Sequence, residues 1–192
     1  PGMEGGNALA RILFGEVNPS GKLPFAVPER EADLPFFDPD ALHIEYGYYH
    51  GYRLLQKEGK KAAFPFGFGL HYTEFVYSGV KLDRDRYGPG DTITLSVEVK
   101  NTGSRHGTEV VQVYASQDAP SVDRPLQELK GFARTALAPG EEKEVCIRVP
   151  VKNLAYYHPE KGEWTVEPGT YTLSAGPSSE RSELLKAGFS VE

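Results

Sequence analysis

The stretch TITLSVEVKNTG, residues 92–103, shows most clearly which fold the chain adopts. Apolar side chains occupy every second position from Ile93 to Val99, and polar side chains fill the positions between them. This period of two is typical of a β-strand with one face in a core and the other in water. The turn-forming residues 101–103 then end the strand. The stretch therefore predicts a half-buried strand of a β-sheet protein.

The same pattern continues on both sides of this strand, from Phe75 to the last residue. Short alternating runs are separated by turn residues, so we predict about seven strands over residues 75–192 and an immunoglobulin-like or fibronectin type III-like β-sandwich. The final run, KAGFSVE at residues 186–192, is expected to be an edge strand. The other runs are TEVVQVYAS (108–116), LQELKGFARTAL (126–137), LAPGEEKEVCIRV (137–149) and WTVEPGTYTLSAG (164–176).

Residues 1–28 follow a different pattern. NALARILF, residues 7–14, places three apolar side chains, ending at Leu13, on one face of a helix, and Gly15 follows as a C-terminal cap. A helix of about eight residues is unstable alone, so its apolar face needs a partner surface. A proline-flanked extended segment follows at residues 23–27. We expect this part to be the end of a larger domain in a longer polypeptide.

Residues 29–74 show little regular pattern and are rich in aromatic residues, prolines and glycines. Only the region around residues 48–55 is expected to hold a short element, so we predict an irregular, aromatic-rich linker. The predicted fold class is therefore mostly β: a sandwich preceded by this linker and by a short helix–strand remnant of an α/β domain.

Composition narrows the function classes. The 192 residues carry a formal net charge of −6, and no apolar run approaches the roughly 18 residues that cross a bilayer. Neither nucleic acid nor membrane is therefore expected as a partner. One cysteine excludes an internal disulfide framework. No signal peptide is visible, the chain is expected to be soluble, and its compartment stays open.

Carboxylates and aromatic side chains gather in one stretch, as in the active sites of glycoside hydrolases. Two catalytic carboxylates need a fixed separation that neighbours in a loop do not define, so we assign no catalytic residue here. The tyrosines are interpreted as an aromatic face that packs on a neighbouring surface, with sugar stacking as the alternative. The stretch contains Asp38, Asp40, His43, Glu45, Tyr46, Tyr48, Tyr49, His50, Tyr52 and Arg53. The possible substrate-cleft or inter-domain contacts among them are Tyr48, Tyr49, Tyr52 and Arg53.

No cofactor or metal site is predicted. The five histidines lack ligand spacing, and no phosphate loop, dinucleotide fingerprint or GxSxG motif appears. Cys146 alternates with inward-facing neighbours, so it is expected on the outer face of its strand without a base to activate it. Trp164 opens a strand and is expected to anchor the core or a domain interface.

The order of the motifs along the chain resembles the C-terminal third of glycoside hydrolase family 3, the β-glucosidase and β-xylosidase family. The resemblance covers nearly all 192 residues. It is carried by GGNALARILFGEVNPSGKLPFAVP (5–28), YGYYHGYRLL (46–55), FPFGFGLHYTEF (64–75), VKNTGSRHGTEVVQVYAS (99–116), RPLQELKGFARTALAPGE (124–141) and WTVEPGTYTLSAGPSS (164–179).

This resemblance implies three parts. Residues 1–28 are then the end of the family's α/β sandwich domain, residues 29–74 the linker, and residues 75–192 the fibronectin type III-like domain. The stretch at 64–75 is expected at the junction, with aromatic side chains in the seam and glycines where the backbone passes close to a neighbour.

The family uses a retaining mechanism, with an aspartate nucleophile and usually a glutamate acid/base on upstream domains. No residue here matches either role, and Glu45 is displaced by one position from a glutamate of the middle motif, so no role is carried over to it. The resemblance thus implies that this part stabilises the catalytic domains and shapes the substrate cleft. Expected partners are the N-terminal catalytic domains, in the same protein or on a partner chain, and an oligosaccharide or glycoside substrate. The alternative is a free-standing fibronectin-like module that binds carbohydrate or protein.

Overall fold

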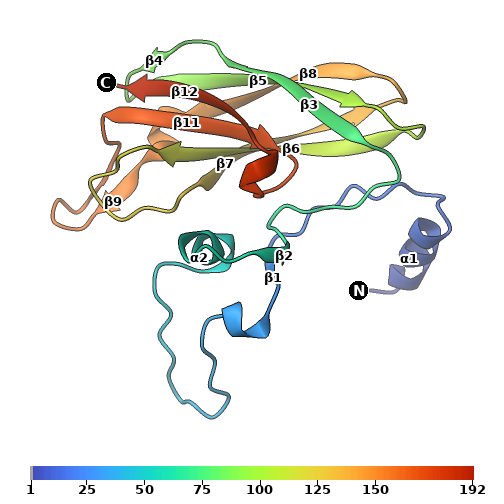
Figure 1. The fold of residues 1–192 in the computed structure, drawn as a ribbon, viewed down its shortest axis with the longest axis horizontal. Coiled ribbons are helices and arrows are strands. Elements are labelled where there is room, and N and C mark those ends of the chain that lie inside the picture. Colours follow the sequence, from blue (N-terminus) through green and yellow to red (C-terminus); the bar gives the residue numbers. More distant parts are fainter. Residues whose placement is uncertain (1) are drawn as a thin grey trace.

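A computed structural model describes residues 2–192, so Pro1 of the expected α/β remnant lies outside the described residues (Figure 1). Before the sandwich, the chain forms α1 (Gly5–Leu13), β1 (Val27–Pro28), a 3-10 turn (Glu31–Asp33), α2 (Gly51–Lys57) and β2 (Ala62–Phe64). The sandwich region contains β3 (Phe75–Leu82), β4 (Arg86–Tyr87), β5 (Thr92–Asn101), β6 (Gly107–Gln117), β7 (Glu128–Leu137), β8 (Glu142–Pro150), β9 (Tyr156–His158), β10 (Glu163–Thr165), β11 (Gly169–Gly176) and β12 (Leu185–Val191), with 3-10 turns at Val151–Leu154 and Arg181–Glu183.

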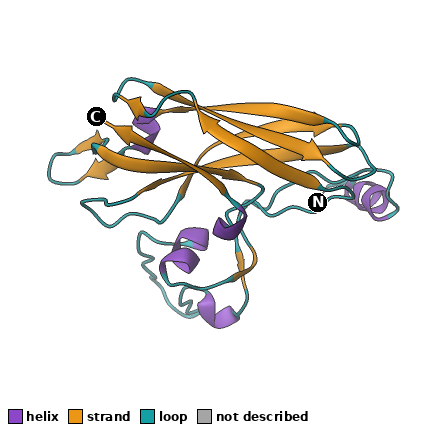
Figure 2. Ribbon diagram, turned by 45° about the horizontal axis from the view of Figure 1, so that its top comes forward, coloured by secondary structure: helices purple, strands orange, loops and turns teal. Residues whose placement is uncertain are grey.

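Two sheets pack face to face, as Figure 2 shows. One has the strand order β4-β12-β11-β6-β7 and the other the order β3-β5-β8. The short strands β9 and β10 form a separate hairpin. We predict about seven strands, and residues 75–192 contain seven strands of seven or more residues together with three short ones, β4, β9 and β10. The fold is a fibronectin type III-like sandwich and mostly β.

The stretch at residues 92–103 forms β5, the middle strand of the three-stranded sheet. Its alternating apolar side chains, Ile93 to Val99, are fully buried. In the antiparallel register, Leu95 pairs with Ile147 and Val97 pairs with Val145. Each buried aliphatic side chain stabilises the fold by roughly 1.5–3 kcal/mol. The alternation therefore reflects the core, because only the apolar face of β5 packs against the opposite sheet.

The expectation that KAGFSVE ends the sheet as an edge strand is wrong. Strand β12 lies between β11 and β4, and β4 pairs in parallel with Ser190 and Val191. The cause is Tyr87 of β4, which is buried and packs edge-on against Phe189 at a centroid distance of 5.6 Å. This one aromatic side chain holds the turn segment before β5 against the sheet.

The linker is bounded by a pair of short strands, β1 and β2, that the sequence does not predict. Of the expected extended segment 23–27, only Val27 enters strand β1, where it pairs with Phe64 of β2. The chain therefore leaves the sandwich side at residue 29 and returns to the same place at residue 61. The part of this excursion before α2 forms an arm that projects away from the sandwich (Figure 1). The short element expected around residues 48–55 is α2.

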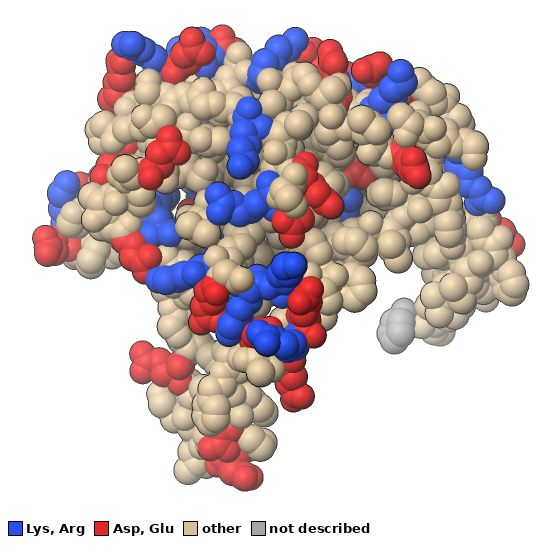
Figure 3. Space-filling model, in the orientation of Figure 1, with Lys and Arg blue, Asp and Glu red and all other residues tan. Residues whose placement is uncertain are grey.

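The predicted first helix is present as α1, and Gly15, at φ 75°, donates its N–H to the carbonyl of Ile12 beyond the helix end. None of the residues of α1 is buried. Leu13 and Phe14 are 69% and 84% exposed. In Figure 3 this region shows almost no charged side chains on the visible face. The apolar face of α1 therefore stays uncovered by the described chain.

Two single residues were also predicted from the pattern. Cys146 is exposed on β8, as expected for the outer face of its strand. Trp164 is 72% exposed on β10, so the expected place in the core is wrong, while its alternative place in a domain interface stays a prediction. It packs instead against Tyr157 of the same hairpin, with ring centroids 5.8 Å apart.

None of the helices described in residues 2–192 combines the length and hydropathy that a bilayer crossing needs.

Candidate functional site

The helix α2 fixes the linker on the five-stranded sheet. Its Tyr52 ring stacks on Phe66 at 5.0 Å and meets the Tyr114 ring edge-on at 6.1 Å. The Tyr52 hydroxyl accepts a hydrogen bond of 3.1 Å from the backbone N–H of Leu129 in β7. Aromatic contact on one side and a backbone hydrogen bond on the other thus hold α2 at the start of β7.

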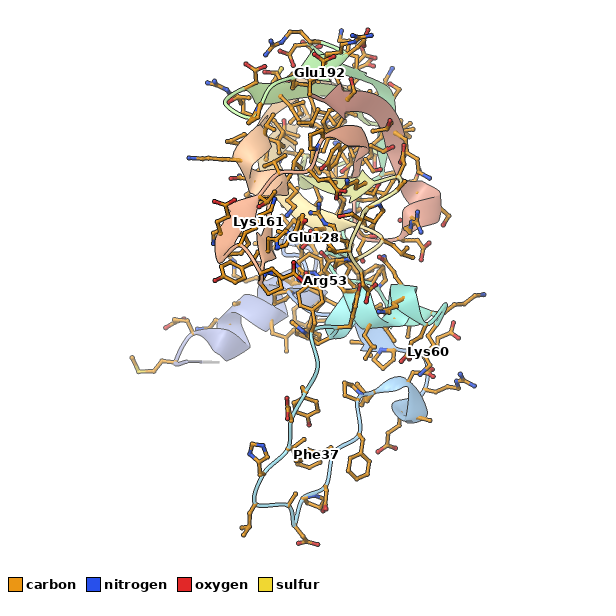
Figure 4. The ribbon with its side chains drawn as sticks, turned by 90° about the vertical axis from the view of Figure 1, so that its left-hand side faces the viewer. Phe37, Arg53, Lys60, Glu128, Lys161 and Glu192 are labelled. Carbon is orange, nitrogen blue, oxygen red and sulfur yellow. The ribbon has the colours of Figure 1, made fainter. Side chains whose placement is uncertain are left out.

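Arg53, the next residue of α2, enters a group of charges at the same place. Its guanidinium lies 3.3 Å from the carboxylate of Glu128. Arg124 and Lys130 lie 3.5 Å and 3.3 Å from that carboxylate. Figure 4 shows Arg53 and Glu128 beside each other between the linker and the sandwich. We call these four residues the Glu128 cluster, and its formal charge is positive because three cations share one carboxylate.

A β-bulge shapes this cluster. In the pairing of β6 with β7, Val113 faces Gly131 while its neighbour Tyr114 faces Leu129, so Lys130 is an extra residue on β7. A bulge of this kind re-aims side chains and occurs often beside functional sites. Burial lowers the pKa of Lys130, and the nearby Arg124 adds to this shift, which Glu128 only partly opposes.

The Glu128 cluster lies in an open groove of about 910 Å³. The linker, the loop before β7 and the β9–β10 hairpin form its walls. Aromatic side chains stand at its rim, and Tyr48 and Trp164 are both more than half exposed. The lining residues are Tyr48, Arg53, Val122, Asp123, Arg124, Glu128, Leu129, Lys130, Lys152, Asn153, Ala155, Tyr156, Tyr157, Pro159 and Trp164.

Tyr49 and Lys57 hold the loop that forms one wall. The Tyr49 hydroxyl donates a 2.8 Å hydrogen bond to Asp123, and the Lys57 ammonium pairs with the same carboxylate. Lys57 also lies over the Tyr49 ring, 3.7 Å from its centroid. The hydrogen bonds from Lys57 and Tyr49 hold the pKa of Asp123 below its usual value. The loop and the linker are therefore joined directly.

The structure brings the four residues singled out in the sequence to one place. Tyr48 and Arg53 line the groove, Tyr49 supports its wall, and Tyr52 anchors α2 beneath it. The acidic residues of the same stretch lie elsewhere, since Glu45 is exposed on the arm. Arg124, Glu128 and Lys130 were missed, because the run RPLQELK was interpreted only as the start of a strand. The alternation of charges in that run was the available signal.

A second group of polar side chains resembles catalytic machinery, but its central carboxylate is closed to solvent. Glu109 of β6 is fully buried, and Lys22, His71 and Tyr77 contact it at 2.8, 3.3 and 2.9 Å. Burial by itself raises the pKa of Glu109, but these contacts outweigh burial and lower it. Because Lys22 and His71 come from the part before the sandwich, the group joins the two. Within residues 2–192, no three His, Cys, Asp or Glu side chains are arranged to hold a metal ion.

Tyr52→Phe tests the anchor of α2. We expect the variant to lose about 1–2 kcal/mol of unfolding free energy, because the Leu129 N–H is left without its acceptor. Chemical denaturation measures the loss, and the Leu129 amide should exchange its hydrogen faster than in the parent chain. Tyr48→Phe is the matched control at an exposed ring and should change neither quantity. Equal effects of the two variants would contradict this role of the Tyr52 hydroxyl.

Family models match both parts of the chain. The model of the glycosyl hydrolase family 3 C-terminal domain matches residues 1–72, and the model of the fibronectin type III-like domain matches residues 109–179. The thermostable β-glucosidase B of Acetivibrio thermocellus is 40% identical over 97% of this chain and 25% of its own length. The β-xylosidase of Formosa agariphila is 40% identical over 100% of this chain and 26% of its own length.

Solved structures give the same relation. The crystal structure of β-D-glucoside glucohydrolase from Trichoderma reesei matches 100% of this chain and 29% of its own with a TM-score of 0.89 and 28% identity. The chain spans about a quarter of the length of the curated relatives it matches. The resemblance found in the sequence motifs is thereby confirmed. The chain belongs to glycoside hydrolase family 3 and corresponds to the C-terminal part of its members.

Proposed function

We propose that this chain is the C-terminal part of a retaining β-glycosidase that removes terminal β-linked sugars from oligosaccharides or glycosides, as a β-glucosidase does. The observation that carries the proposal is the match of nearly the whole chain to relatives that are named β-glucosidase and β-xylosidase and are about four times as long. The catalytic aspartate and glutamate then belong to upstream domains. The division into residues 1–28, 29–74 and 75–192 is part of this proposal.

The role of this part is to hold and stabilise the catalytic domains. The uncovered apolar face of α1 supports it, since an exposed face of this kind in a short helix needs a partner. A second apolar surface lies on the arm, where Phe36, Phe37 and Leu42 are largely exposed, and Figure 4 shows Phe37 on the part of the arm that is separate from the sandwich. Both surfaces suit the missing catalytic domains, and the arm then forms one lip of the substrate cleft.

Hydrolysis of an aryl β-glucoside and an aryl β-xyloside tests the proposed activity. The full-length protein should hydrolyse one of them with retention of configuration at the anomeric carbon, while the 192-residue chain should hydrolyse neither. Inversion by the full-length protein would overturn the retaining mechanism. Turnover by the 192-residue chain would overturn the assignment of catalysis to upstream domains. The free-standing binding module is the less supported function, because it leaves the face of α1 without a purpose.

Phe14→Ser tests the role of the α1 face. In the 192-residue chain we expect a change within about 0.5 kcal/mol, because the ring is exposed there. In the full-length protein, burial against an upstream domain should make the same change cost about 3–5 kcal/mol of unfolding free energy. Thermal unfolding of both proteins measures the difference. Val76→Ser, at a half-exposed apolar position on β3, is the control and should affect both proteins alike. Equal effects of Phe14→Ser in the two proteins would contradict the docking of α1.

A further inference from the structure

We propose that the groove around the Glu128 cluster binds the carboxylate of an acidic sugar, a uronic acid within an oligosaccharide. The carboxylate part of this inference rests on the charges and shape of the groove. The sugar part rests on the proposed glycosidase function.

The first argument is the charge that remains in the cluster. Arg124 already has other partners, because its guanidinium donates hydrogen bonds to the Gln117 side chain and the Leu154 carbonyl, both at 2.8 Å. Within residues 2–192, the acidic partner of Lys130 is Glu128 alone. An ammonium has three donors, and holding a poorly solvated one beside two guanidinium groups is unfavourable. A bound carboxylate would supply the missing negative charge.

The second argument is the bulge on β7. In a regular strand, successive side chains point to opposite faces of the sheet. Here Glu128, Leu129 and Lys130 all line the same groove. The extra residue at Lys130 makes this possible, since it breaks the alternation at that point. The chain thus places a partly buried ammonium, with 14% of its side chain exposed, in the groove at the cost of one regular strand pair.

The third argument is the aromatic rim. Tyr157 and Trp164 stand edge to face on the β9–β10 hairpin, and Tyr48 stands on the linker wall. All three rings are more than half exposed. Exposed aromatic rings beside a few polar groups suit a ligand with apolar faces and polar edges, as sugar rings have. The groove, at about 910 Å³, is within the size range of small-ligand sites.

The position of the groove favours a ligand over a neighbouring domain. Strand β9 and α1 lie at opposite ends of the sandwich in Figure 1. Upstream polypeptide that covers α1 would therefore leave the hairpin wall of the groove open, even where it also reaches the arm. A small acidic sugar is therefore the occupant that we propose.

The single tryptophan makes the test direct, because Trp164 lies in the groove and its fluorescence reports binding there. The probes are a xylo-oligosaccharide with one glucuronic acid branch and the same oligosaccharide without the branch. We expect the 192-residue chain to bind the branched probe at least about tenfold more tightly, from the charge-assisted contacts with Lys130 and Arg53. Binding of the branched probe should also weaken as salt increases.

Variants separate the charge from the rings. Lys130→Met keeps the volume of the side chain and should weaken binding of the branched probe at least about tenfold, with little effect on the neutral one. Tyr157→Ala should weaken the binding of both probes. Lys143→Met, which removes an ammonium on β8 outside the groove, is the matched control and should change neither. Circular dichroism of each variant verifies the fold.

Several outcomes would overturn the proposal. Equal affinity for the two probes would exclude recognition of the carboxylate. Equal effects of the two lysine variants would exclude a specific contact between Lys130 and the probe. Binding by the 192-residue chain but not by the full-length protein would mean that upstream polypeptide fills the groove. Tighter displacement by a polyglutamate peptide than by the branched probe would identify a protein segment as the occupant. None of these outcomes depends on hydrolysis, so this test and the activity test fail independently.

Discussion

Glu109→Ala is expected to lower the unfolding free energy of the chain by about 3–5 kcal/mol, the loss typical of a broken buried ion pair. The substitution leaves Lys22, whose side chain is only 11% exposed, without its carboxylate and Tyr77 without its acceptor. Denaturation by urea, followed by circular dichroism, measures the loss. Because Lys22 precedes the linker, residues before the sandwich should also become more sensitive to proteolysis.

Two controls accompany this variant: one removes an exposed ion pair elsewhere, and the other removes Glu109 together with its partner Lys22. Glu142→Ala removes the exposed pair with Lys100 and should cause no measurable change. The double variant Glu109→Gln, Lys22→Met should recover part of the loss, since it removes both charges together. A change of less than about 1 kcal/mol for Glu109→Ala would contradict the structural role of this carboxylate.

The contribution of Glu109 also has a predictable dependence on pH. Its pKa is lowered in the folded chain, so the stability it adds is complete above its unfolded value and is lost as the pH falls through the folded value. The difference in stability between the parent chain and Glu109→Gln should therefore be full at neutral pH and shrink below about pH 4. A difference that grows on acidification would contradict the sign of this shift.

Gly67→Ala is expected to cost about 2–4 kcal/mol, from backbone strain and overpacking together. Gly67 has a φ of 80°, and a Cβ there would overlap the carboxamide of Gln112. That side chain is buried and makes three hydrogen bonds, to the carbonyls of Gly67 and Pro177 and with the Tyr114 hydroxyl. Moving it aside breaks these bonds, so the overlap cannot be relieved cheaply.

Gly140→Ala separates the two causes. Gly140 has a similar φ of 76°, but a Cβ there meets no atom within 4 Å. This variant should therefore show the strain alone, about 1–2 kcal/mol. Thermal or urea unfolding of both variants gives the comparison. If Gly140→Ala costs as much as Gly67→Ala, the close approach to Gln112 contributes nothing.

The sandwich could be predicted from the sequence because each strand shows its own alternating pattern within a short stretch of residues. Alternation along residues 92–99 identifies both the strand and its buried face, since one sheet face meets a core. The glycine expected to let the backbone of the junction pass close to a neighbour is present as Gly67 against Gln112. The motif order likewise identified the family, because it is a property of the sequence alone.

The site could be predicted only in part, because its other half depends on pairing between distant residues. Tyr48 and Arg53 stand out as aromatic and charged residues in a loop, whereas the bulge at Lys130 arises from the register of β7 against β6. No local pattern shows which residue of RPLQELKG is the extra one. The same reason explains Trp164, since a period of two cannot tell a strand of the sandwich from a strand of an exposed hairpin.

The pairing of β1 with β2 allows the chain between these strands to vary in length. The two strands bring Val27 and Phe64 together, so residues 29–61 begin and end at a fixed point. Lengthening a loop whose ends are already joined costs little entropy. Insertions or deletions in residues 34–47, before α2, would therefore leave the orientation of the helix before the excursion and of the sandwich after it unchanged. Such a change in length could fit a different neighbour while the framework on either side stays the same.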